Sequence, residues 1–81
     1  MSDVKNIDKK KVIDVIKNLD KYSITSFSLK ILLGQLKVKL EVDQTGKAEK
    51  ECIEKIILYI EKYGSLPNVK KDIKELFNLD L

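Results

Sequence analysis

The sequence predicts a small α+β domain, in which an amphipathic two-stranded antiparallel hairpin is covered by three helices. Two observations lead to this fold class. Apolar and polar residues alternate on both sides of Gly34, which is typical of strands. The segments before and after carry apolar residues at helical spacing instead. With 81 residues the chain is long enough for one compact domain over 1–81, in the order α-β-β-α-α.

The first helix is predicted over residues 7–22. Asn6 or Asp8 is suited to cap its start, because both side chains can accept hydrogen bonds from free backbone amides. One apolar stripe at helical spacing follows, made of Val12, Val15, Ile16, Leu19 and Tyr22.

The hairpin is predicted from strands over residues 26–33 and 36–43. Gly34 and Gln35 fit a type II′ turn, since glycine readily adopts the positive φ of its first central position. In this register eight apolar side chains share one face. They are Phe27, Leu29, Ile31, Leu33, Leu36, Val38, Leu40 and Val42.

A helix competes with the hairpin over the same residues. It would gather the leucines on one side and leave Phe27, Ile31, Val38 and Val42 on the opposite side, so that the helix has two apolar stripes. The hairpin places both sets on one face and is therefore preferred. The alternative fold is an all-α four-helix bundle.

Two further helices are predicted, over residues 47–63 and 67–78. A turn at Asp43–Gly46 precedes the first of them, and Gly64 follows it as a stop signal. Ser65 and Pro67 are typical of a helix start.

The composition argues against an enzyme. The chain has no histidine, which is the usual proton-transfer group near neutral pH and a frequent metal ligand. Its one cysteine, Cys52, lies beside an apolar helix stripe with no base nearby, so we expect a buried structural thiol and no cofactor or metal. The single cysteine and the lack of an apolar signal core or membrane span predict a cytoplasmic, intracellular protein without membrane contact.

All 16 basic residues are lysine, and the net charge is +3. Lys30, Lys37 and Lys39 would share the outward face of the hairpin, and Lys9, Lys10 and Lys11 cluster in the first helical turn. Such lysines could contact the phosphates of DNA or RNA. The absence of arginine and of aromatic residues on this face argues against sequence-specific reading.

Residues 57–69 resemble the opening of LexA-type helix-turn-helix domains, in which a helix runs into a Gly-x-x-Pro-x-Val turn. The resemblance covers about 20 residues when the helix that follows the turn is included. It implies that Lys70, Lys71 and Lys74 face DNA. The step from Val69 to Ile73 is one residue longer than in that family, and the chain ends before a further recognition helix. The predicted element order also resembles one class of KH domains, but the three glycines form no Gly-x-x-Gly loop. We assign no family.

Protein binding is the leading expectation for function. Leu32 and Leu58 lie off the main apolar stripes, and Leu79 and Leu81 end the chain in apolar residues. Together with open hairpin edges, these residues could dock a larger protein or complex, and a hairpin edge could also form a homodimer. We therefore expect a non-enzymatic accessory subunit, adaptor or inhibitor, with non-specific nucleic-acid binding as the alternative.

Overall fold

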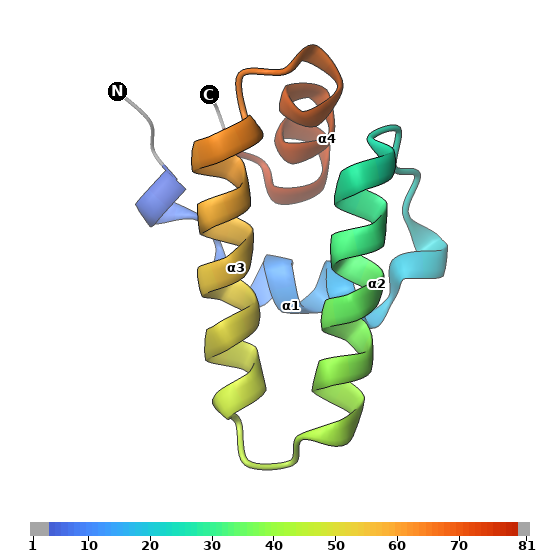
Figure 1. Cartoon of the computed structure of the whole chain (residues 1–81), viewed down its shortest axis with the longest axis vertical. Helices are drawn as coiled ribbons and strands as arrows, with labels where there is room; N and C mark the ends of the chain where they lie inside the picture. The colour runs from blue at the N-terminus through green and yellow to red at the C-terminus, as the bar shows by residue number, and fades with distance from the viewer. Residues whose placement is uncertain (1–3, 80–81) are drawn as a thin grey trace.

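The computed structural model describes residues 4–79, and every element in this part of the chain is helical (Figure 1). The elements are η1 (Val4–Asn6), α1 (Lys9–Lys17), η2 (Leu19–Lys21), α2 (Phe27–Val42), α3 (Lys47–Tyr63) and α4 (Pro67–Phe77), where η marks a short 3-10 helix.

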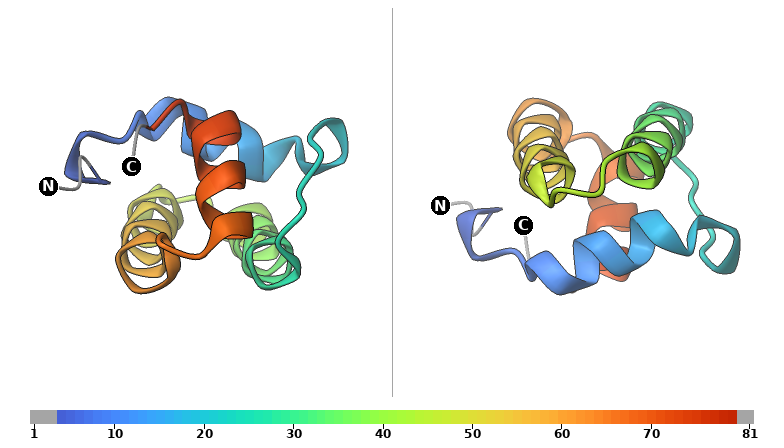
Figure 2. Two further views of the ribbon diagram at one scale, coloured as in Figure 1. Left: turned by 90° about the horizontal axis from the view of Figure 1, so that it is seen from above. Right: turned by 90° about the horizontal axis from the view of Figure 1, so that it is seen from below.

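The two long helices, α2 and α3, run antiparallel and are joined by a short loop at one end of the molecule (Figure 1). α1 crosses one side of this pair and contacts α2, α3 and α4, while α4 closes the end opposite the α2–α3 loop (Figure 2). Among residues 4–79, no element covers the side of the α2–α3 pair that faces away from α1 (Figure 2).

A single apolar core lies between the four helices. It is formed by buried side chains from every helix, together with residues that precede α1 and follow α4. Its members are Val4, Ile7, Val12, Val15, Ile16, Leu29, Leu33, Leu36, Cys52, Ile56, Ile60, Val69, Ile73, Leu76, Phe77 and Leu79.

The predicted hairpin is wrong, because residues 27–42 form the continuous helix α2, with Gly34 inside it. The described residues contain no strand, so the hairpin edges and the homodimer expected through them have no structural basis. The all-α four-helix alternative is the one that fits.

Ser26 explains why the helix starts where it does. Its backbone is extended, and its side-chain oxygen accepts a hydrogen bond from the amide of Leu29, which is the geometry of a helix N-cap. A helix also satisfies its own backbone hydrogen bonds, whereas a lone two-stranded hairpin leaves its edges unpaired and is marginally stable in water. The alternation of apolar residues results from two helical stripes on opposite sides of α2.

The other helices lie close to their predicted positions. The predicted range 47–63 is confirmed as α3, and 67–78 is nearly that of α4, with Pro67 in its first turn. The first helix is shorter than predicted. Asp8 caps it by accepting from the amides of Lys10 and Lys11, but α1 ends at Lys17 and continues only as the short helix η2.

Candidate functional site

The outward face of α2 carries a line of exposed apolar side chains. Phe27, Ile31, Val38 and Val42 are 76%, 46%, 61% and 77% exposed. Their spacing places them within about 60° of one another around the helix axis, over nearly the full length of α2. We call these four residues the α2 apolar face.

The opposite side of the same helix belongs to the core. Leu29, Leu33 and Leu36 are buried, and Leu32 and Leu40 pack partly against them. α2 therefore has two apolar sides, of which the protein covers one. The sequence contains the pattern of this exposed face, because its four residues form the second apolar stripe of the helical alternative. The predicted hairpin instead placed the same four residues on the face that packs against the core.

Polar residues flank the α2 apolar face on both sides. On the side toward α1 and η2 lie Lys30, Lys37 and Glu41, as their helical positions require. On the side toward α3, the hydroxyl groups of Ser28 and Tyr59 share a hydrogen bond, and Lys39 forms an ion pair with Glu51. The hydrogen bond between Lys39 and Glu51 raises the pKa of the lysine and lowers the pKa of the carboxyl group.

Gly34 lies halfway along α2, at the edge of the α2 apolar face that is nearer to Lys30. A Cβ atom added there would meet nothing within 4 Å, so packing within this chain does not require glycine. Glycine inside a helix costs about 1 kcal/mol relative to alanine. Next to it, a shallow groove of about 700 Å³ runs between α2 and the residues around η2. Because Gly34 has no side chain, the helix backbone is accessible at this point.

The lysines expected to contact nucleic acid do not form one face. Lys30 and Lys37 share a flank of α2, but Lys39 lies about 180° around the helix from Lys30. The prediction that Lys30, Lys37 and Lys39 share one outward face is therefore wrong. Of the α1 lysines, Lys11 is engaged with Tyr22, with its Nζ 5.2 Å from the ring centroid and 3.4 Å from the hydroxyl oxygen.

The leucines expected to dock a partner are also separated. Leu58 is 64% exposed on α3, whereas Leu32 is half-buried against the core and does not point outward. Leu79 is buried, because Asn78 adopts a left-handed conformation (φ 54°) that ends α4 and turns the chain back. Leu81 lies outside the described residues.

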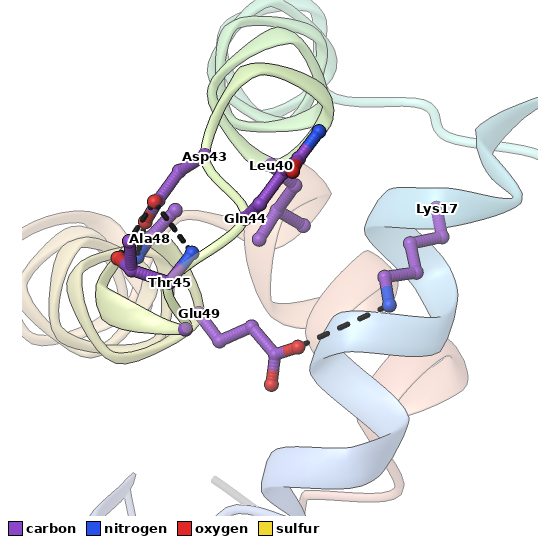
Figure 3. A pocket seen from close by; sticks show the side chains of 8 residues that line it. Lys17, Leu40, Asp43, Gln44, Thr45, Ala48 and Glu49 are labelled. Carbon is purple, nitrogen blue, oxygen red and sulfur yellow. Dashed lines mark hydrogen bonds and ion pairs between the residues drawn. The ribbon is translucent and has the colours of Figure 1, made fainter.

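A hollow of about 340 Å³ at the α2–α3 loop has polar walls, and several of its polar groups interact with one another (Figure 3). The Asp43 carboxylate accepts hydrogen bonds from the amide and hydroxyl of Thr45 and, at 2.6 Å, from the amide of Ala48. Lys17 Nζ lies 3.9 Å from Glu49 Oε2. These bonds join α1, the loop and the start of α3, so we assign the hollow a structural role.

Cys52 is fully buried on α3, and its thiol lies 3.7 Å from the carbonyl oxygen of Leu36. Burial raises the pKa of this thiol, which keeps it protonated and unreactive near neutral pH. Among residues 4–79, no three histidine, cysteine, aspartate or glutamate side chains are grouped so that they could hold a metal ion.

The segment that resembles a helix-turn-helix forms the connection between α3 and α4. Gly64 does not adopt a left-handed conformation there (φ −64°). Glycine is needed for space instead, since a Cβ would collide with the carbonyl oxygen of Ile60. Lys70, Lys71 and Lys74 are exposed on α4.

None of the helices in the described part of the chain is long and apolar enough to cross a membrane. Comparisons with protein-family models, with curated proteins and with solved structures found no match to this chain.

Proposed function

We propose that this protein is a small, non-enzymatic interaction module that binds another protein chain through the α2 apolar face. It would serve as an accessory subunit, adaptor or inhibitor of an assembly. The observation that carries the proposal is a line of four exposed apolar side chains on a helix whose other side is fully used by the core. Contiguous apolar surface of this kind is typical of interaction sites.

The spacing of the four side chains suits recognition of a helix lying on an apolar surface. Such interfaces use anchors one and two turns apart along one helix face. Full burial of a valine, isoleucine or phenylalanine side chain contributes about 1.5–3 kcal/mol. Phe27 is the largest and among the most exposed of the set, so we expect it to contribute most.

The flanks support the same function. Apolar residues surrounded by Ser28, Lys30, Gln35 and Glu41 reproduce the composition of a protein interface, with an apolar centre and a polar rim. The polar rim keeps the free module soluble and fixes the orientation of a bound partner.

Site-specific photo-crosslinking in the source cell tests this function. A photoreactive amino acid replaces Val38 on the α2 apolar face, and in a matched control it replaces Lys50 on the exposed side of α3. We expect a discrete crosslinked product from position 38 and none from position 50. Equal labelling at both positions, or no product at position 38, would overturn the proposal.

A further inference from the structure

We infer that the α2 apolar face binds a second copy of this chain, with the two α2 helices antiparallel about a two-fold axis between Gly34 and Gln35. This inference rests on the docking function proposed above and names its occupant. It depends on three features of α2: the order of its apolar residues, the charges beside them and the central glycine.

The apolar residues are symmetric about the middle of the helix. Phe27 and Val42 lie equally far from the midpoint between Gly34 and Gln35, and so do Ile31 and Val38. In a two-fold interface, any contact of one residue with a second is repeated in reverse. An antiparallel pair in this register places Phe27 against the partner's Val42 and Ile31 against the partner's Val38. Each contact then joins a larger side chain to a smaller one.

The charges favour the antiparallel arrangement over a parallel one. In a parallel two-fold pair, the flanks that carry Lys30 and Glu41 would lie on opposite sides of the contact in the two chains, so these charges would not meet across it. In the antiparallel register, Lys30 lies within about 3 Å along the axis of the partner's Glu41. The partner's Lys37 lies equally near Lys30 along the axis, but it is about 40° further around the helix from the contact line than Glu41, so Glu41 is the nearer charge. The pair therefore gains two equivalent opposite-charge contacts.

Gly34 lies where the two helices come closest. The monomer has no packing use for glycine there, since a Cβ would meet nothing within 4 Å. Near a two-fold axis, however, the absence of a side chain lets the two backbones approach. The symmetric register thus explains a residue that the isolated fold does not.

Sedimentation equilibrium over a concentration series tests the dimer. A contact between two helices of 16 residues is small, so we expect a dissociation constant in the micromolar range. Val38→Glu should abolish the dimer. Leu58→Glu is the matched control, because Leu58 is as exposed (64%) as Val38 (61%) but lies on α3. Circular dichroism confirms that both variants fold.

A charge exchange tests the direction of the helices. Lys30→Glu alone should weaken the dimer about 10-fold or less, since rim charge pairs contribute modestly. Adding Glu41→Lys should restore the affinity of the dimer, because each pair of positions 30 and 41 again carries opposite charges, with the two signs exchanged. A parallel dimer would gain nothing from the second change, so an unrestored double variant would overturn the antiparallel register.

Crosslinking tests the register in a Cys52→Ala background. Gln35→Cys lies beside the proposed axis and should be joined to its copy by a short bismaleimide. Ser28→Cys lies on the same flank, but its copy is about 20 Å away along the axis, so it should not be joined. Crosslinking at position 28 would indicate a parallel pair and overturn the inference.

The photo-crosslinking experiment separates failure of this inference from failure of the docking function. A product of twice the chain mass from position 38 supports self-association. A monomer in sedimentation, together with a product containing a different protein, overturns self-association and leaves docking intact. A monomer without any product overturns both.

Discussion

The buried carboxylate of Asp72 on α4 accepts a hydrogen bond of 2.7 Å from the backbone amide of Ser26, the residue that caps α2. The same carboxylate accepts from the amide of Thr25 at 3.0 Å and from its hydroxyl at 2.7 Å. Asp72 is 1% exposed. It thus fixes α4 to the start of α2 and places a negative charge at the positive end of that helix.

Replacing Asp72 with alanine should lower the free energy of unfolding by about 3 kcal/mol or more. The change leaves donors of Thr25 and Ser26 without their acceptor, and each unpaired buried group costs about 1–3 kcal/mol. Chemical denaturation measures the loss. Glu75→Ala on the exposed side of the same helix is the control, with an expected change within about 0.5 kcal/mol. Equal effects of the two changes would show that Asp72 does not hold α2 in place.

The sequence was sufficient to predict α3 and α4 because their signals agree. In α3, Gly46 and Gly64 bound one apolar stripe, and in α4 Pro67 precedes another. α2 was mispredicted because its two apolar stripes add up to a period of two, which imitates a strand. The hydrogen bond from the Ser26 amide to Asp72, which anchors the start of α2, joins residues 46 positions apart and leaves no local pattern.

The candidate site was hidden by the same error. Its four residues are plain in the sequence, but exposure depends on which side of α2 the other helices cover. Leu79 shows the opposite case, because a terminal leucine becomes buried only through the left-handed turn at Asn78. Apolar pattern therefore predicts that a residue lies on a stripe, while packing decides whether that stripe is covered.

Because of Asp43, the fold should lose stability as the pH falls into the acid range. Hydrogen bonds from Thr45, followed by one from Ala48, hold the pKa of this carboxyl group below its ordinary value. A carboxyl whose pKa is lower in the folded state stabilises the fold above its unfolded pKa, and this contribution disappears as the pH falls through the folded pKa.

Thermal melts of the wild type and Asp43→Asn from about pH 6 to about pH 3 measure this contribution. At the upper pH the variant should melt at a lower temperature, because its amide group cannot accept from both Thr45 and Ala48. The difference should shrink toward the lower pH as the wild-type carboxylate is protonated. A constant difference over the whole range would contradict a role for its charge.

Nucleic-acid binding through α2, the alternative function, should depend on Lys30 and Lys37 and not on Lys39. The first two share a flank, whereas Lys39 is engaged by Glu51. Fluorescence anisotropy with generic DNA and RNA over a salt series measures the effect. The double change Lys30→Gln and Lys37→Gln should reduce the slope of log affinity against log salt by about 2, and Lys39→Gln should alter it little. No binding by the wild type at low salt would eliminate this function.

Gly34→Ala should stabilise the monomer and weaken the dimer. In the single chain the new methyl group meets nothing, and alanine is favoured over glycine inside a helix by about 0.5–1 kcal/mol. In the proposed dimer two such methyl groups enter the closest approach of the helices. Denaturation at concentrations below the dissociation constant should therefore show higher stability, while sedimentation at high concentration shows less dimer.

A variant that dimerises as well as the wild type would show that the helices do not meet closely at Gly34. A monomer that loses stability would mean that the outward side of α2 is covered within the chain itself.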